Sequence, residues 1–192
     1  YTGLPSIFIR LQGCPVGCPW CDTKHTWVVN VDAKASSSEV LNKTAESDTW
    51  FSATSDDITA LLARLTYSAK HVVITGGEPC MYDLTELTRL AHSKGYSTQI
   101  ETSGTFEILT SKETWVTVSP KINMQGGYKM RSDALSRANE IKHPVAMQKH
   151  IDELDLLLAS MDQSALPLIY LQPISQQKRA TDLAVKTCIQ RN

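Results

Sequence analysis

Short apolar runs alternate with amphipathic segments along the chain, and this alternation constrains the fold more than any other feature. Runs rich in β-branched and aromatic residues predict strands at 7–11, 71–75, 96–101, 114–118 and 168–171, with a weaker one at 144–146. Apolar residues at helical spacing predict helices at 55–65, 83–94, 132–142, 151–161 and 180–190. A strand followed by a helix, repeated along the chain, favours the α/β class with a parallel sheet and right-handed crossovers.

Polar or glycine-containing segments follow five of the predicted strands. They are Cys14–Cys21, Gly76–Pro79, Glu101–Gly104, Ser119–Lys121 and Gln172–Ser175. In parallel α/β folds the carboxyl ends of the strands gather on one face, where ligands bind. We therefore expect these five segments to contribute to a single site.

Cys14, Cys18 and Cys21 lie close together in the first of these segments, and the chain holds 5 cysteines in all. An odd number with three crowded thiols does not fit a secreted disulfide framework and indicates metal ligands. One candidate is zinc with His25 as the fourth ligand. The other is an iron–sulfur cluster with three thiolate ligands and one open iron. The triplet alone does not separate these two, but an open iron needs a further ligand and a site for it, which the other polar segments would supply.

The two remaining cysteines stand alone in the sequence. Cys80 follows the Gly76–Pro79 segment, and Cys188 lies on the apolar face of the last predicted helix. Free cysteine commonly behaves as a small buried apolar residue. We therefore expect both in the core.

Composition limits the function classes. The chain has 192 residues, is 42% hydrophobic and carries a formal net charge of −1, so it can build a core and is not suited to bind nucleic acid by bulk electrostatics. No apolar run reaches the roughly 18 residues that a membrane span requires. We expect one domain over 1–192, with an exposed polar insertion at about 30–54 holding one short helix near 39–46. Because Tyr1 is not a start methionine, native N- and C-terminal segments are expected beyond the sequence.

The Cys-x₃-Cys-x₂-Cys segment after the first strand and Gly-Gly-Glu-Pro after the second together resemble the radical S-adenosylmethionine (SAM) superfamily. Segments 9–14, 21–27, 73–79, 100–105, 118–121 and 171–175 narrow the resemblance to the 7-carboxy-7-deazaguanine synthases, most of all the enterobacterial type. The resemblance implies a shortened, partial (β/α)₆ TIM-like barrel and a cytoplasmic homodimer. It also implies a lyase that converts 6-carboxy-5,6,7,8-tetrahydropterin to 7-carboxy-7-deazaguanine with loss of ammonia, in queuosine and 7-deazapurine biosynthesis.

The resemblance also implies cofactors and residue roles. Cys14, Cys18 and Cys21 would hold a [4Fe–4S] cluster, and Thr23 would bind Mg²⁺. Arg10 and Thr75 would bind the substrate, since a guanidinium matches a carboxylate. The residues expected to bind SAM are Gly77, Glu78, Ser119, Pro120, Lys121, Gln172 and Ser175. Trp20 would offer an apolar face near the cluster, and Asp22 lies near enough to meet substrate nitrogens.

Within this scheme the glycines would allow backbone to approach SAM, and Glu78 would support its cationic amine. The cluster would be reduced by an external one-electron donor of the flavodoxin type, and the substrate radical would form at C6 of the pterin. Neither nucleic acid nor a membrane is an expected partner.

Two alternatives remain open at this point. Another radical SAM enzyme, such as a glycyl-radical activase, would share the cysteine spacing and the short chain. A zinc-stapled binding module using Cys14, Cys18, Cys21 and His25 would not be an enzyme at all.

Overall fold

Six parallel strands form one sheet in the computed structural model, which describes residues 3–191, with the side chain of Gln176 left out. The strands lie in chain order: β1 (Ser6–Leu11), β2 (His71–Gly76), β3 (Ser97–Thr102), β4 (Trp115–Val118), β5 (Glu140–Val145) and β6 (Leu168–Pro173). Spatial order that equals chain order makes every crossover turn the same way, as in a barrel. The sheet is an open, partial (β/α)₆ barrel, which confirms the predicted α/β class.

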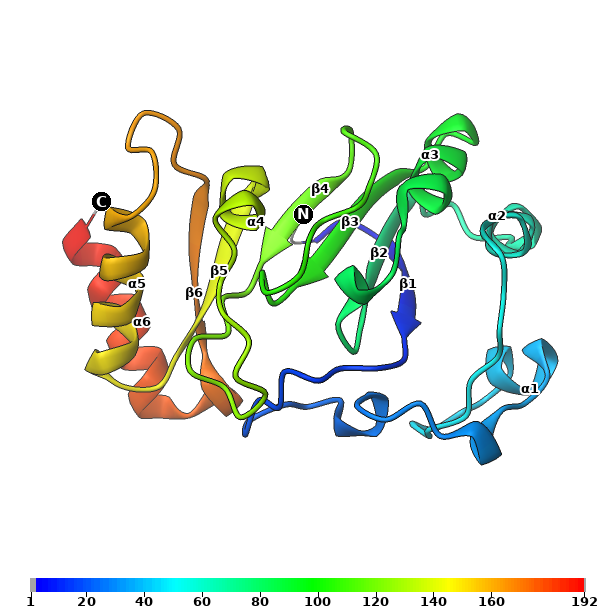
Figure 1. Ribbon diagram of the computed structural model, residues 1–192, viewed down its shortest axis with the longest axis horizontal. Coiled ribbons are helices and arrows are strands. Elements are labelled where there is room, and N and C mark those ends of the chain that lie inside the picture. Colours follow the sequence, from blue (N-terminus) through cyan, green and yellow to red (C-terminus); the bar gives the residue numbers. More distant parts are fainter. Residues whose placement is uncertain (1–2, 192) are drawn as a thin grey trace.

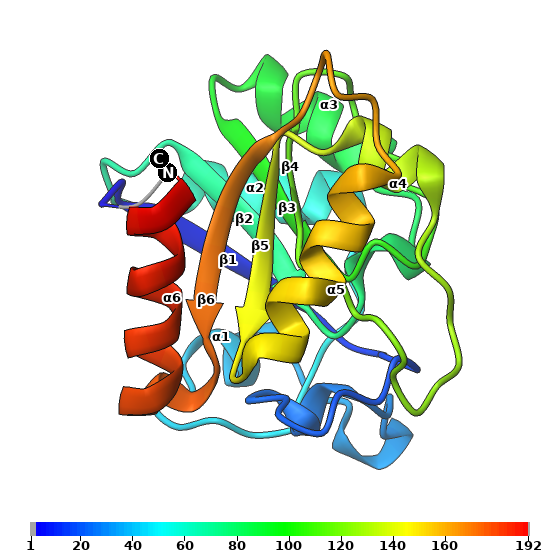
Figure 2. The same ribbon diagram turned by 90° about the vertical axis from the view of Figure 1, so that its left-hand side faces the viewer.

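In the described part of the chain, six α-helices connect or flank the strands: α1 (Ser37–Leu41), α2 (Ser55–Arg64), α3 (Thr85–Ser93), α4 (Ser132–Arg137), α5 (Gln148–Ala159) and α6 (Lys178–Arg191). Helices α3, α4, α5 and α6 pack against β3, β4, β5 and β6 respectively, and α2 lies beside α3 (Figures 1 and 2). Within the described residues, no helix combines the length and the apolar character needed to cross a bilayer.

The main core lies between the sheet and these helices. Ile74, Ile100, Val116, Val118 and Ile141 are fully buried and form one cluster with apolar residues of α3 and α5. Successive strand residues point to opposite faces, so the neighbours of these core residues point into the barrel. The helix-covered face therefore stabilises the fold, and the inner face is left for polar side chains.

The segment between β1 and α2 crosses beneath the carboxyl ends of the strands (Figure 1). It includes 3₁₀ turns at Lys24–Thr26 and Val31–Ala33, then α1, which starts at a capping box formed by Ser36 and Glu39. The short helix predicted near 39–46 thus lies a few residues earlier. Lys34 and Trp50 form an isolated parallel bridge, and the Trp50 indole donates to the Asn30 carbonyl at 2.7 Å.

The helix predicted over 132–142 is wrong at its C-terminal end. Helix α4 ends at Arg137, and Ala138 already has an extended backbone (φ −64°, ψ 130°). The Asn139 side chain accepts a hydrogen bond from the Val116 amide, and β5 begins at Glu140. The apolar positions Leu135, Ala138 and Ile141 fit helical spacing, but the pattern arises from a short helix followed by a strand.

The two isolated cysteines differ in their environment. Cys80 is buried, as predicted, whereas Cys188 is exposed, which corrects the core position expected for it. The buried face of α6 is made of Ala180, Ala184 and Thr187, and Cys188 lies one position beyond that stripe. Helical spacing therefore placed Cys188 beside the covered face of α6 without making it part of that face.

We expect Ile100→Ala to destabilise the protein, because Ile100 is 0% exposed at the centre of the sheet. Removing its side chain should lower the free energy of unfolding by about 2–5 kcal/mol. The matched control Ile189→Ala, at a position 74% exposed on α6, should change it by about 0.5 kcal/mol or less. Urea unfolding monitored by circular dichroism measures both, and equal effects would contradict the core described above.

Candidate active site

A cavity of about 450 Å³ lies at the carboxyl ends of the strands. Its lining includes these sequence-predicted residues: Arg10, Cys14, Cys18, Trp20, Cys21, Asp22, Thr23, Thr75, Gly77, Glu78, Ser119, Lys121, Gln172 and Ser175. Pro120 is buried and lies outside this lining, as does His25. The structure therefore brings together nearly every residue that the sequence singled out. Glu101, Thr102 and Ser103 also line the cavity, so all five predicted segments contribute to it.

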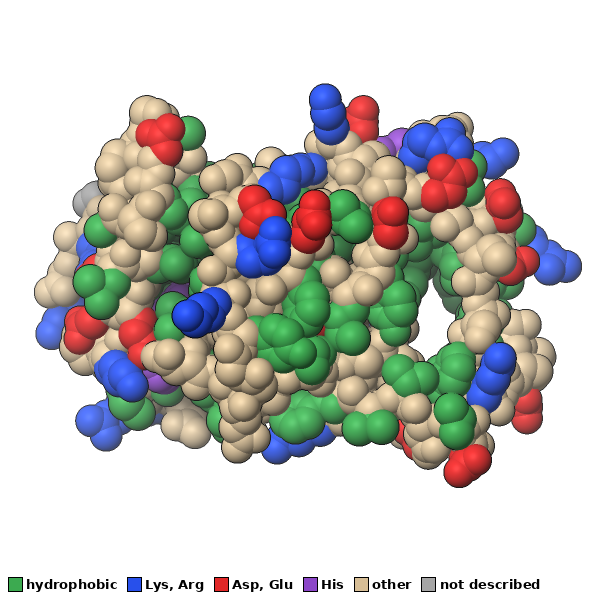
Figure 3. All heavy atoms as spheres, in the orientation of Figure 1, with side chains coloured by type: hydrophobic (Ala, Val, Ile, Leu, Met, Phe, Trp, Pro, Cys, Tyr) green, Lys and Arg blue, Asp and Glu red, His purple; other side chains and the backbone are tan. Residues whose placement is uncertain are grey.

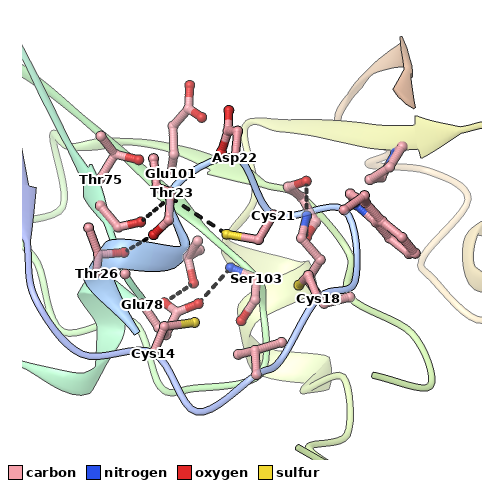
Figure 4. A pocket seen from close by; sticks show the side chains of 18 of the residues that line it. Cys14, Cys18, Cys21, Asp22, Thr23, Thr26, Thr75, Glu78, Glu101 and Ser103 are labelled. Atoms are coloured by element: carbon pink, nitrogen blue, oxygen red, sulfur yellow. Dashed lines mark hydrogen bonds between the residues drawn. The ribbon is translucent and has the colours of Figure 1, made fainter. Parts of the chain in front are cut away.

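The cysteine-containing segment is fixed by backbone hydrogen bonds to the turn that follows it. The Gly13 and Cys14 amides donate to the carbonyls of Thr26 and Trp27 at 2.7 and 3.0 Å. The indole of Trp27 donates to the Cys21 sulfur at 3.2 Å. Figure 4 shows Cys14, Cys18 and Cys21 around the same side of the pocket, and all five cysteines of the chain are free thiols.

Burial controls the protonation of these thiols. Desolvation raises the pKa of Cys14, and it raises the pKa of Cys18 to about 11 although the Lys121 ammonium opposes the shift. Both groups therefore hold their protons at neutral pH in the absence of a metal. A bound metal reverses this preference, because a coordinating thiol is deprotonated outright.

Lys121 lies deep in the same cavity and donates to the carbonyl and the hydroxyl of Ser119. Burial lowers the pKa of its ammonium, and the nearby Cys18 raises it in partial compensation. A cationic donor held among the thiols is suited to anionic or carbonyl oxygens of a ligand.

The glycine turn after β2 packs directly on the cysteine-containing segment. The amides of Gly77 and Glu78 donate to the carbonyls of Leu11 and Gly13, both at 2.8 Å. A Cβ atom added to Gly77 would lie 2.1 Å from the Gly13 oxygen, and Gly76 has a φ of +116°. Both positions therefore require glycine for contact with the protein's own backbone, a reason that the sequence did not reveal.

Glu78 is 2% exposed, and its carboxylate accepts three hydrogen bonds. The donors are the Thr102 hydroxyl at 2.6 Å, the Ser103 amide at 2.8 Å and the Cys80 amide at 3.0 Å. Glu78 thereby ties the turn after β2 to the turn after β3 (Figure 4). The carboxylate predicted to meet a ligand amine is already a structural link, although it still borders the cavity.

Sequence analysis did not assign a role to two charged cavity residues, Glu101 and Lys142. The Lys142 ammonium lies 2.5 Å from the Glu101 carboxylate, and both side chains line the cavity. Lys142 was not predicted to lie in the site because it fell inside the predicted helix over 132–142. Glu101 lies near the end of β3 and is the first residue of the polar segment 101–104, which was the available clue to its position.

Trp20, between two of the cysteines, reaches toward the start of α5. Its ring lies 6.3 Å from that of His150, tilted by 40°. The His150 ring in turn accepts the Ala146 amide at 2.9 Å. Trp20 thus both lines the cavity and anchors its loop on the β5–α5 connection.

The donor set fits a multi-iron cluster better than a single zinc ion. Among residues 3–191, no group of three or more His, Cys, Asp or Glu side chains is placed to hold one metal ion. The three cysteines instead border a shared space. In a [4Fe–4S] cluster each thiolate binds its own iron, so the sulfurs need not meet at one point.

Comparison with known proteins agrees with this geometry. The family model described as "Radical SAM superfamily" matches residues 8–143. The chain is 57% identical over 192 residues to the 7-carboxy-7-deazaguanine synthase of Escherichia coli K12, covering 100% of this chain and 86% of that protein. It is 44% identical to the enzyme of the same name from Buchnera aphidicola, with the same coverages of 100% and 86%. The crystal structure of QueE from Escherichia coli superimposes with a TM-score of 0.96 at 57% identity, covering 100% of this chain and 84% of that one.

We expect Gly77→Ala to impair metal retention, because its methyl group would collide with Gly13, next to Cys14. Iron content after anaerobic reconstitution should fall well below that of the wild type. The control Gly95→Ala strains a backbone with φ +80° but has no atom within 4 Å of the new Cβ, so it should lose stability and keep its iron. Full iron occupancy in Gly77→Ala would contradict the close approach of the two segments.

Proposed function

Since the chain belongs to the 7-carboxy-7-deazaguanine synthase family of the radical SAM superfamily, we propose that it converts 6-carboxy-5,6,7,8-tetrahydropterin to 7-carboxy-7-deazaguanine and ammonia. It is a radical SAM lyase of the queuosine pathway. The observation that carries the substrate assignment is the shared cavity, in which the cysteines, the glycine turn and Arg10 lie together. Membership of this family favours the proposed reaction over the two alternatives from the sequence, a zinc-stapled binding module and a glycyl-radical activase.

The radical SAM family implies a [4Fe–4S] cluster and SAM as cofactors. When bound, they supply one electron and a 5′-deoxyadenosyl group that removes hydrogen from the substrate. Cys14, Cys18 and Cys21 would provide the three thiolates, with their protons released on binding. The protein's own contribution is to bind, to orient and to exclude water.

The proposed SAM-binding residues are Gly77, Glu78, Ser119, Pro120, Lys121, Gln172 and Ser175. The Lys121 ammonium and the Ser119 hydroxyl offer donors for carboxylate or ribose oxygens. Ser175 has a φ of +52°, a left-handed conformation that is uncommon for serine. Such strain often accompanies functional sites, and it supports the assignment of Ser175. Pro120, outside the cavity lining, would act only through its neighbours.

Arg10 and Thr75 are the proposed substrate-binding residues, and Thr23 the proposed Mg²⁺ ligand. The Arg10 guanidinium makes no ion pair within the described residues, so it is available to a substrate carboxylate. Among residues 3–191 the Thr23 hydroxyl has only long contacts, at 3.5 Å to the Gly76 carbonyl and 3.6 Å to the Cys21 sulfur. A hard oxygen donor with unused capacity suits Mg²⁺.

We also propose that an external one-electron reductant of the flavodoxin type reduces the protein. A cytoplasmic location and a homodimeric state are further parts of the proposal. Three exposed side chains surround Gly13, which directly precedes Cys14: those of Val29, Met81 and Tyr82. Each comes within 4 Å of the position that a Cβ atom would take at Gly13. Apolar side chains also gather along the lower edge of the face in Figure 3. An apolar surface beside the cysteine-containing segment supports docking of an electron donor there.

We expect the reconstituted protein to form 7-carboxy-7-deazaguanine and ammonia in equal amounts from 6-carboxy-5,6,7,8-tetrahydropterin, with SAM, Mg²⁺ and dithionite under anaerobic conditions. Liquid chromatography with mass spectrometry follows substrate and product. Cys18→Ala should yield no product, because one cluster ligand is lost. Iron-loaded wild-type protein that cleaves SAM but leaves the pterin unchanged would refute the proposed reaction.

We expect Thr23→Ala to raise the Mg²⁺ concentration required for half-maximal activity by about tenfold, which corresponds to ~1.4 kcal/mol. Iron content should be unaffected, since Thr23 is not a cluster ligand. The matched variant Thr23→Ser keeps the hydroxyl and should stay near the wild type. Identical Mg²⁺ dependence in all three proteins would remove Thr23 from the metal site.

A further inference from the structure

Trp27 contacts two of the three cysteines that border the cavity. Its backbone carbonyl accepts the Cys14 amide at 3.0 Å, and its indole Nε1–H donates to the Cys21 sulfur at 3.2 Å. Its own amide donates to the Lys24 carbonyl at 3.2 Å, at the end of the 3₁₀ turn Lys24–Thr26. The indole is therefore directed at its acceptor by a backbone that is itself bonded to the cysteine-containing segment.

The hydrogen bond to sulfur distinguishes Cys21 from the other two cysteines. Within residues 3–191, neither Cys14 nor Cys18 accepts a hydrogen bond from a side-chain N–H. The Thr23 hydroxyl also lies near the Cys21 sulfur, but at 3.6 Å, which makes the indole the closer donor. The proposed reaction uses Cys21 as a ligand and assigns no role to the indole that bonds it.

A cation lies over the same indole ring. The exposed Lys24 ammonium is 5.8 Å from the centroid of the Trp27 ring, within the range of a cation–π contact. Positive charge over the ring draws electron density from the indole nitrogen, so its N–H becomes a stronger donor. A series of contacts thus runs from an exposed charge to the cavity, which Trp27 and Cys21 both line.

An N–H directed at a ligating sulfur changes how readily an iron–sulfur cluster is reduced. Reduction transfers one electron from the external donor, which is oxidised, to the cluster, and the thiolate ligands carry part of the added negative charge. A hydrogen bond to the sulfur stabilises this more negative state more than the oxidised one. Such hydrogen bonds are among the factors that set cluster potentials, so the loss of the donor should lower the potential.

We propose that Trp27 is a positioning residue that orients the Cys21 sulfur and raises the reduction potential of the bound [4Fe–4S] cluster, and that Lys24 strengthens this effect. The proposal rests on the proposed function through the cluster and not through the pterin. A higher potential allows an external donor of modest reducing power to deliver the electron.

The test measures the reduction potential of the cluster in the reconstituted holoprotein, without SAM or substrate. An anaerobic redox titration is followed by the electron paramagnetic resonance signal of the reduced cluster. Trp27→Phe keeps an aromatic ring and removes the N–H, so the iron content should equal that of the wild type. At a fixed solution potential, its ratio of reduced to oxidised cluster should be about tenfold lower, which corresponds to a midpoint lower by ~59 mV.

Trp50→Phe is the matched control. Trp50 is also half-buried, and the exposed Lys34 ammonium lies 5.5 Å from the centroid of its ring. Its indole donates to the Asn30 carbonyl and not to a sulfur. The same substitution at this position should therefore leave the reduction potential unchanged.

Lys24→Met should lower the ratio of reduced to oxidised cluster by about threefold at low ionic strength, because an exposed charge acts through a screened field. In about 1 M salt this variant should match the wild type, whereas Trp27→Phe should keep its shift, since a hydrogen bond is a direct contact. Equal potentials of Lys24→Met and the wild type at low ionic strength would overturn the part assigned to Lys24.

If Trp27→Phe fails to hold iron, 3-benzothienylalanine introduced in place of Trp27 carries the same expectation. This isostere of tryptophan keeps the bicyclic ring and replaces only the N–H with sulfur. A purely structural role of Trp27 predicts no change of potential in such a protein, because the ring still fills its place.

Two results would overturn the inference: an iron-loaded protein that lacks the N–H at position 27 and has the wild-type potential, or an equal shift in Trp27→Phe and Trp50→Phe. Either result leaves the proposed reaction standing if the wild type converts the pterin. A wild type that holds no [4Fe–4S] cluster after reconstitution overturns the proposed function and this inference together.

Discussion

The contact between the glycine turn after β2 and the backbone after β1 is the constraint on which the site depends. Two amide-to-carbonyl hydrogen bonds join Gly77 to Leu11 and Glu78 to Gly13, and no side chain fits between the two segments. Gly13 directly precedes Cys14, so the same contact that closes the turn also sets the start of the cysteine-containing segment. Side chains at Gly76 or Gly77 would push these segments apart and displace the first sulfur.

Glu78 extends this constraint across the sheet. Its buried carboxylate collects donors from its own turn and from the turn after β3, and each such bond offsets the cost of burying the charge. Loops that follow the carboxyl ends of strands are ordinarily among the mobile parts of a fold. Here three successive loops are connected by backbone and carboxylate hydrogen bonds, which preorganises the cavity before any ligand binds.

The sequence predicted the parts of the site whose chemistry is local. The cysteine spacing and the Gly-Gly-Glu-Pro turn can each be recognised from a few consecutive residues. Because both follow strands of a parallel sheet, the predicted fold placed the two motifs in the same site. The role of Glu78 as a link needed the position of Thr102 and Ser103, which no local pattern contains. Lys142 was hidden because an apolar spacing of three residues suits a helix as well as a helix followed by a strand. The roles of individual site residues stay predictions.

Electrostatic balance connects the buried charges of the cavity. The Cys14 and Cys18 thiols are desolvated, so their thiolate forms are costly until a metal binds, and the Lys121 ammonium offsets part of that cost at Cys18. Lys121 is itself disfavoured as a cation by burial and by the nearby Lys142. The ion pair between Lys142 and Glu101 places a carboxylate beside that second cation. Glu101 therefore neutralises Lys142 through one oxygen, and within the described residues its other oxygen accepts no hydrogen bond.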